Sequence, residues 1–142
     1  MIYDLPSFNF SNLQQSIFVS NLIKNSNSKI NLIYSYHQYF WQGPQFIKSL
    51  FNASLDKNIN HIAYCKNNTG MVLSLLRLGI KKIAFDKKNL KIFEKILNLS
   101  KKNNCNIYNF KKFNKKNFIN DLSDNIRFEK NVVSYLKKEK FL

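Results

Sequence analysis

The chain has 142 residues, a formal net charge of +15 at pH 7 and an aromatic content of 15%. That length suits a single domain, which can bury a real core without disulfides or metal. The 13 Phe and 7 Tyr, set against 3 Gly and 2 Pro, exclude collagen, a mucin-like stalk and a disordered chain. Two cysteines exclude a disulfide scaffold. Because neither a signal peptide nor a run of roughly 18 apolar residues is present, we expect a cytoplasmic protein with no membrane partner.

The positive charge has two sources. The 21 Lys and 22 Asn are typical of an AT-rich coding bias, which raises the net charge without any polyanion partner. Glu codons are equally AT-rich, yet the chain has only 3 Glu, so this bias does not explain the whole imbalance. The charge is also uneven, with +2 over residues 1–55 and +13 over residues 56–142. It is densest over residues 87–116, where ten Lys accompany a single Glu.

The elements expected along the chain alternate between strands and helices. Residues 1–28 give a mixed pattern, with a short amphipathic helix from near Ser11. Residues 30–36 are rich in β-branched and aromatic residues and predict a buried strand. The remaining pattern predicts a helix opened by Gly43-Pro44, followed by a strand over 59–65 and a helix over 70–78. Thr69 is the expected N-cap of the second of these helices, and Gly79 its expected C-cap. A strand over 82–85, a helix over 89–102 and a strand over 106–110 complete the series, and the last helix is expected to bury Leu90, Phe93, Ile96 and Leu97.

This βαβαβαβ order predicts the fold class. We expect a single α/β domain with a four-stranded, mostly parallel sheet and helices on both faces. Residues 1–28 form an N-terminal segment, residues 29–110 the α/β core, and residues 111–142 a basic helical tail of one or two helices. The residues predicted to be buried on the four strands are Leu32, Ile62, Ile83 and Ile107. The apolar residues that indicate the tail helices are Phe118, Ile119, Leu122, Ile126, Val132, Val133 and Leu136.

Several short motifs over residues 30–110 resemble a group of small uncharacterised alphaproteobacterial proteins. The motifs are Gly43-Pro44 after the first strand, a strand ending in Cys65, Gly70 five residues on, and Leu73-x-x-Leu76-Arg77-x-Gly79. In that group we expect an acid-Cys-Gly-acid turn, whereas here Tyr64, Lys66 and Asn67 replace the acid, the glycine and the acid. The resemblance implies a compact α/β fold and brings no activity with it. A weaker likeness, to ribosomal proteins of the L7Ae type, rests on a glycine, a short helix ending Gly-x-x-Lys, a strand and Asp86.

Cys65 is the weak catalytic candidate of the chain. A cysteine at a strand end, before a turn and a helix, is the arrangement that stabilises a nucleophilic thiolate. The phosphate loop of cysteine-dependent phosphatases also needs an arginine six residues on, where this chain has Met71. The competing interpretation makes Cys65 a small buried apolar residue. His37, near another strand end, is more typical of a hydrogen-bonded loop histidine than of a catalytic base.

No metal or cofactor is expected. His61 and Cys65 share one face of a strand, but four residues at about 3.3 Å each separate them by roughly 13 Å, too far for one zinc ion. The chain has no Cys-x-x-Cys pair, and its phosphate-loop pattern fails because the turn before the helix contains one glycine.

Anion binding is the better-supported hypothesis. Ligands of parallel sheets bind beyond the carboxyl ends of the strands, and helix N-termini at Thr69 and Asn89 would offer free N–H groups there. The residues expected at that edge are Lys66, Asn67, Asn68, Thr69, Gly70, Lys87, Lys88, Lys111 and Lys112. These residues favour a non-enzymatic module that binds RNA, a ribonucleoprotein or a protein. The alternatives are a small-molecule or phosphate site around Cys65, extending to a cysteine-dependent enzyme, and lysines that merely fill turns.

Overall fold

The structure is a computed structural model that describes residues 1–114, 116–118 and 124–140. Its elements, with 3₁₀ turns labelled η, are η1 (Ile2–Asp4), β1 (Ser7–Asn9), α1 (Leu13–Ile23), β2 (Ile30–Ser35), η2 (Tyr36–Gln38), η3 (Phe40–Gln42), α2 (Gly43–Ala53), β3 (Ile59–Tyr64), α3 (Thr69–Arg77), β4 (Lys82–Phe85), α4 (Leu90–Lys102), β5 (Asn106–Asn109), η4 (Phe110–Lys112), β6 (Lys116–Asn117) and α5 (Asn125–Lys138). The predicted single α/β domain is confirmed.

Within the described ranges the sheet has six strands in the order β5-β4-β3-β2-β1-β6, and every neighbouring pair is parallel. The four predicted strands are β2 to β5, and they are parallel neighbours as expected. The predicted number of strands is wrong because β1 and β6 have only three and two residues, too few for a periodic pattern to show. The N-terminal segment and the tail therefore each contribute a strand to the sheet.

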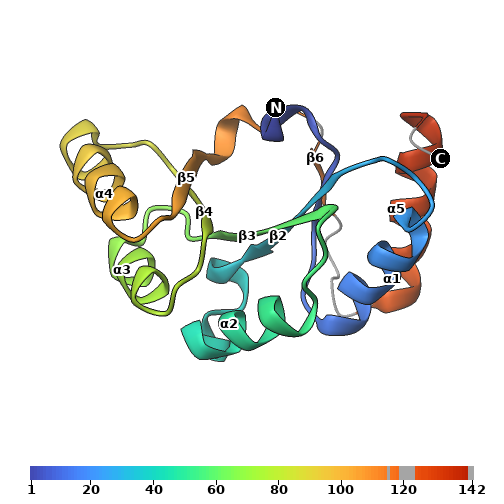
Figure 1. The fold of residues 1–142 in the computed structure, drawn as a ribbon, viewed down its shortest axis with the longest axis horizontal. Helices are drawn as coiled ribbons and strands as arrows, with labels where there is room; N and C mark the ends of the chain where they lie inside the picture. Colours follow the sequence, from blue (N-terminus) through green and yellow to red (C-terminus); the bar gives the residue numbers. More distant parts are fainter. Residues whose placement is uncertain (115, 119–123, 141–142) are drawn as a thin grey trace.

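The five α-helices of the described residues pack on one face of the sheet, so the prediction of helices on both faces is wrong. Each step from β1 to β5 moves to the next strand in the same direction across the sheet. Right-handed crossovers then place every connecting helix on the same side, because helices change sides only where the strand order reverses. Figure 1 shows the helices following one another around the sheet, with the N-terminus and the segment after β5 on the other side.

The main core lies between the sheet and the helices. It takes alternate strand residues, such as Phe8, Leu32 and Ile83, together with buried residues from every helix. Leu32, Ile62 and Ile83 are fully buried as predicted, whereas Ile107 is half-buried because β5 is an edge strand. Leu90, which was predicted to be buried by its helix, is 62% exposed, so that prediction is wrong. Of the apolar residues that indicate the tail helices, Ile126 is 66% exposed, and Ile119 and Leu122 lie outside the described residues.

The ends of α3 show how local sequence sets helix boundaries. Asn68, and not the predicted Thr69, is the N-cap, since its side-chain oxygen accepts a hydrogen bond from the Met71 N–H at 3.0 Å. At the other end Gly79 has φ of +82°, the left-handed conformation that glycine adopts without steric cost. The N–H groups of Gly79 and Ile80 donate to the carbonyls of Leu76 and Leu75, which completes a Schellman motif and confirms the predicted C-cap.

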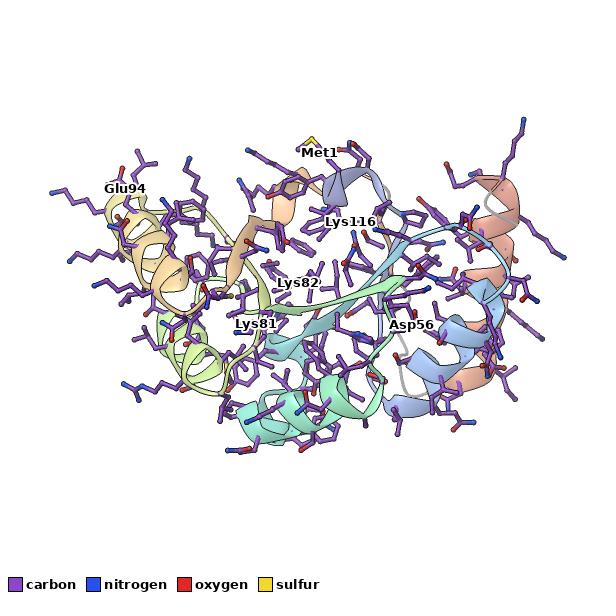
Figure 2. All side chains as sticks on the ribbon, viewed as in Figure 1. Met1, Asp56, Lys81, Lys82, Glu94 and Lys116 are labelled. Atoms are coloured by element: carbon purple, nitrogen blue, oxygen red, sulfur yellow. The ribbon has the colours of Figure 1, made fainter. Side chains whose placement is uncertain are left out.

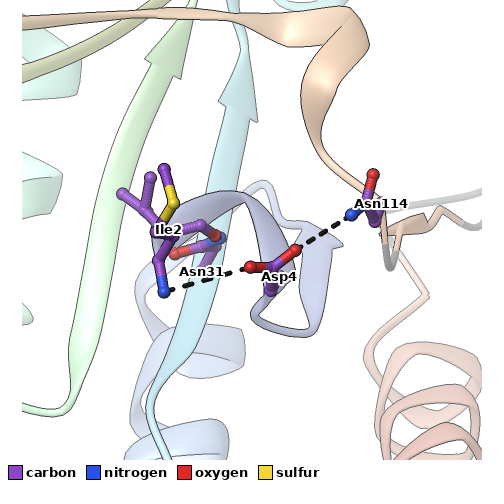
Figure 3. A network of polar contacts seen from close by, with 5 residues as sticks. Ile2, Asp4, Asn31 and Asn114 are labelled. Carbon is purple, nitrogen blue, oxygen red and sulfur yellow. Dashed lines mark hydrogen bonds and ion pairs between the residues drawn. The ribbon is translucent and has the colours of Figure 1, made fainter.

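The helix-free face is covered by the first residues of the chain and by the segment between β5 and β6. Figure 3 shows how the N-terminal turn is held: the Met1 amino group lies 4.0 Å from the Asp4 carboxylate, and the Asn114 side chain donates to that carboxylate at 2.9 Å. The Asn31 amide on β2 donates to the Ile2 carbonyl at 2.8 Å. The N-terminal turn therefore connects the middle of the sheet to the chain that leads into β6.

Tyr3 is the aromatic centre of this cover. Its ring packs edge-on against Phe113 and Tyr108, with centroid distances of 4.9 and 5.9 Å. Its hydroxyl oxygen accepts a hydrogen bond from the Asn109 N–H at 3.1 Å. Together these rings belong to a second, smaller apolar cluster on the helix-free face. One side chain thus joins the N-terminus, β5 and the segment after it.

Replacing Tyr3 by alanine should lower the free energy of unfolding by about 2–3 kcal/mol, less than the roughly 3–5 kcal/mol of a fully buried aromatic side chain because Tyr3 is half-buried. Tyr3→Phe keeps the ring contacts and should cost about 1 kcal/mol, the net value of one hydrogen bond. Urea unfolding measures both values. Equal losses in the two variants would show that the ring packing contributes nothing.

His61 is buried on the helix-facing side of β3. Its Nε2 lies 2.9 Å from the Ser16 hydroxyl and 3.2 Å from the Ser54 hydroxyl, and its ring packs near Phe10 and Phe51. Burial, with the positive charge of Lys82, lowers the pKa of this histidine to about 4. His61 therefore serves as a neutral hydrogen-bonding group of the core, joining β3 to α1 and to the end of α2.

The low pKa of His61 predicts a pH-dependent stability. A histidine in the unfolded chain has a pKa of about 6.5. The contribution of neutral His61 to the free energy of unfolding is therefore fully present above that pH and is lost as the pH falls toward 4. Between pH 7 and 4.5 the loss should be about 2–3 kcal/mol, since each pKa unit is worth about 1.4 kcal/mol. Urea unfolding at several pH values measures it.

The matched variant is His61→Gln, whose amide hydrogen-bonds to the two serines without titrating. The difference between the wild type and this variant isolates the contribution of His61 from that of His37. If the His61 imidazole titrates between pH 6 and 7 in NMR spectra of the folded protein, the prediction fails.

Candidate functional site

The five predicted anion-binding lysines lie in loops that leave neighbouring strands at their carboxyl ends. Lys66 follows β3, Lys87 and Lys88 follow β4, and Lys111 and Lys112 follow β5; all five are exposed. These strands are adjacent in the sheet, and neighbouring strands lie about 4.8 Å apart, so the three loops leave the sheet within about 10 Å. We call these five residues the lysine edge.

The positive charge of the lysine edge is largely uncompensated. Within the described ranges, the one ion pair joins the Met1 amino group to Asp4. Asp86 is the carboxylate at this edge; it is buried, and the Tyr64 hydroxyl donates to its Oδ1 at 2.8 Å. Glu94, the single glutamate of the lysine-dense stretch, projects from α4 at the outside of the molecule (Figure 2).

Lys66 has an unusual backbone conformation. Its φ of 53° lies in the left-handed region that favours glycine. The Asp86 N–H donates to the Lys66 carbonyl at 2.6 Å, which links the turn after β3 to the end of β4. The backbone of Lys66 is thus held in place while its side chain stays in solvent.

The two helix N-termini offer fewer free N–H groups than the sequence predicts. The Asn68 side chain accepts from the Met71 N–H, and the Asn89 side chain accepts from the N–H groups of Lys91 and Ile92. These capping bonds use donors that an anion would need. The lysine side chains are therefore the main anion-binding groups of this edge.

The other predicted residues of the first turn have modest roles. Asn67, Thr69 and Lys88 line a small pocket of about 110 Å³ whose wall also includes Asp86. A carboxylate in the wall disfavours an anion there. A Cβ added to Gly70 would meet the Asn68 side chain at 3.5 Å, an ordinary contact, so space does not require glycine at this position.

Cys65 lies in the core on the helix-facing side, with only 1% of its surface exposed. Burial raises the pKa of its thiol far above the ordinary value, and burial also raises that of Cys105, to about 11. A protonated, inaccessible thiol is a poor nucleophile. This placement agrees with the interpretation of Cys65 as a buried apolar residue. Among the described residues, no group of three or more His, Cys, Asp and Glu could hold a metal ion.

The burial of Cys65 predicts slow chemical modification. In a Cys105→Ser variant, Cys65 is the one remaining cysteine. An aromatic disulfide reagent at neutral pH should modify this thiol at least about 100-fold more slowly than it modifies free cysteine, because burial keeps the thiol protonated and inaccessible. Unfolding in urea should restore the fast rate. A native rate above that of free cysteine would return the cysteine-dependent enzyme to consideration.

A larger pocket, of about 340 Å³, lies on the helix-free face at the carboxyl ends of β1, β2 and β3. We call it the face pocket. Three of its residues come from the strand ends themselves: Asn9, Ser35 and Tyr64. The described residues that line it are Asn9, Ser35, His37, Gln38, Tyr64, Phe110 and Phe118.

Hydrogen bonds fix the polar wall of the face pocket. The Ser35 hydroxyl donates to the Asn9 Oδ1 at 3.0 Å, and the Asn9 amide donates to the Gln38 Oε1 at 2.8 Å. This chain of bonds joins β1, β2 and the turn after β2. The Gln38 amide nitrogen has no hydrogen-bond partner among the described residues, so it is available to a ligand.

The aromatic wall of the face pocket is built around Tyr64. The Phe110 ring stacks on Tyr64 with a centroid distance of 3.7 Å and an angle of 8° between planes, and Phe118 stacks on Phe110 at 5.9 Å. The His37 ring meets Tyr64 edge-on at 5.3 Å. Partial desolvation and the charge of Lys66 lower the pKa of His37, which favours the neutral imidazole.

Sequence reasoning singled out His37 but missed the face pocket. Asn9 was hidden because β1 is too short to predict. Ser35 and Tyr64 carried a usable signal, since each is a hydroxyl-bearing residue at the last position of its strand. That position places a side chain at the carboxyl edge, where parallel α/β folds bind their ligands.

Comparison with known proteins adds no family to this description. No protein-family model matches the chain, and no curated protein matches it. Among the described helices, none has both the length and the apolar character needed to cross a bilayer. The resemblance to the alphaproteobacterial group stays a prediction.

Proposed function

We propose that the protein is a non-enzymatic binding module that associates with a polyanion, namely RNA or an RNA-containing assembly, through the lysine edge. The observation that carries this proposal is the placement of five exposed lysines, none of them in an ion pair within the described chain, in three adjacent loops. Positive side chains that neutralise phosphates release condensed counterions, which drives association without base-specific contacts.

The chemistry of the lysine edge favours backbone contacts over sequence recognition. Lysine acts as a point charge, whereas specific reading of bases relies on the planar fork of arginine. The chain has only two arginines, and neither Arg77 nor Arg127 lies in the lysine edge. We therefore propose binding with little base preference.

An exposed aromatic residue lies at the same edge of the sheet. Trp41, 67% exposed, follows β2 in the turn η3, and its ring packs edge-on against Tyr39 at a centroid distance of 5.7 Å. β2 is the neighbour of β3, which leads into Lys66. Bases of a single strand stack on such rings, so Trp41 suits unpaired RNA better than a duplex.

The salt dependence of RNA binding tests the proposal. For a fluorescently labelled single-stranded RNA, the logarithm of the association constant should fall linearly with the logarithm of salt concentration, with a slope of about −0.7 per contacted phosphate. The double variant Lys87→Glu, Lys88→Glu should reduce the steepness of that slope by about 1.4, because two contacts are lost. Anisotropy of the labelled RNA measures the affinity.

A matched control carries the same change of charge at the other end of α4. Lys101→Glu with Lys102→Glu lies at the carboxyl end of the helix, away from the lysine edge, and should leave the slope unchanged. Absence of binding at low salt contradicts the proposal. An equal effect of both double variants would assign the binding to net charge alone, and would contradict it as well.

A further inference from the structure

We infer that the face pocket is a separate binding site for a nucleobase, presented either by a free nucleotide or by an unpaired base of RNA. This inference goes beyond the proposed function, because the pocket lies on the helix-free face and none of its residues belongs to the lysine edge. Its volume of about 340 Å³ is at the lower end of the range for small-molecule sites, roughly 300–1,000 Å³.

The polar groups of the pocket offer donors and acceptors side by side. The Gln38 amide nitrogen can donate, and a neutral imidazole at His37 can donate from one ring nitrogen and accept at the other. The Ser35 oxygen, which donates its proton to Asn9, keeps lone pairs for a ligand donor. The edge of a nucleobase presents donors and acceptors in the same alternating way.

The remaining described wall favours an uncharged ligand. No charged side chain is among the described residues that line the pocket, so these residues offer no counter-charge to a carboxylate, a phosphate or an amine. Phe110 and Phe118 instead offer apolar ring surface, and flat heteroaromatic rings are recognised by aromatic side chains. The interior therefore fits an uncharged aromatic ring with a polar edge.

Positive charge lies at the rim. The Lys116 ammonium is 4.5 Å from the centroid of the Phe110 ring, which itself lines the pocket. Lys66, in the lysine edge, is close enough for its charge to act on His37. A nucleotide would match this arrangement, with its base in the uncharged interior and its phosphate near the lysines at the rim. Figure 2 shows Lys116 on the same side of the sheet as Met1, the helix-free side.

Titration calorimetry and NMR with defined probes test this site. Adenosine 5′-monophosphate and uridine 5′-monophosphate should bind and shift the side-chain amide signals of Gln38, whereas ribose 5-phosphate, which has no base, should not. A single-stranded RNA and the same RNA with one abasic nucleotide separate the two sources of the base. Saturable binding of a free nucleotide, or weaker binding of the abasic RNA, each supports the pocket.

Two variants connect the signal to the pocket. His37→Ala removes an exposed side chain, and Gln38→Glu removes the amide donor while keeping the acceptor that Asn9 needs. Each should weaken nucleotide binding at least about fivefold, the value of one hydrogen bond. The control, Gln45→Glu, makes the same change of charge at another exposed glutamine and should have no effect.

The inference is overturned if ribose 5-phosphate shifts Gln38 as strongly as the nucleotides do, if neither nucleotides nor the intact RNA reach the pocket, or if both variants bind normally. These outcomes are distinct from failure of the proposed function. RNA binding that keeps its salt slope but ignores both the abasic nucleotide and the pocket variants would leave the lysine edge in place and remove the nucleobase site.

Discussion

The fold of this protein depends on a single constraint, the handedness of the connections between parallel strands. Because β1 to β5 are placed in chain order, each right-handed crossover delivers its helix to the same side of the sheet. The opposite face must then be covered by segments without regular helices, here the N-terminal turn and the stretch around Phe113. The face pocket lies at the carboxyl ends of β1 to β3, where Phe110 and Phe118 of the segments that follow β5 and β6 form part of its wall.

The same constraint explains the character of the face pocket. Successive side chains of a strand point to opposite faces of the sheet. In this sheet the side chains that face the helices are mostly apolar, whereas those that face the short covering segments are both apolar and polar. On β2, Leu32 and Tyr34 enter the helix-facing core, whereas Asn31 and Ser35 face the other side and make hydrogen bonds with β1. Buried polar groups are costly unless they are paired. In the part of the chain that the structure describes, every buried side-chain nitrogen and oxygen has a partner.

Sequence patterns predicted the central part of the molecule well. The strands at 30–36, 59–65, 82–85 and 106–110 and the cap at Gly79 follow from β-branched runs and glycine chemistry, which are local properties. The order of the strands is not local, so the sequence could not reveal that all helices share one face. β6 has two residues and pairs only because the chain crosses the whole sheet first. The position of the lysines could be predicted because each follows the end of a predicted strand. The face pocket could not be predicted, because it depends on the short strand β1 and on the hydrogen bond between Asn9 and Gln38.

The sheet order also has a consequence for the way in which the chain folds. Four of the five strand pairings join consecutive strands, so each requires the closure of one short βαβ unit. The fifth, between β1 and β6, joins Ser7 to Lys116 and spans most of the chain. The pairing of β1 with β6 therefore carries the largest loop-closure entropy cost of the sheet, and it requires the slowest search because its partners are far apart in sequence. A nucleus of local units can form first, and the edge made by β6 is the natural last step of assembly.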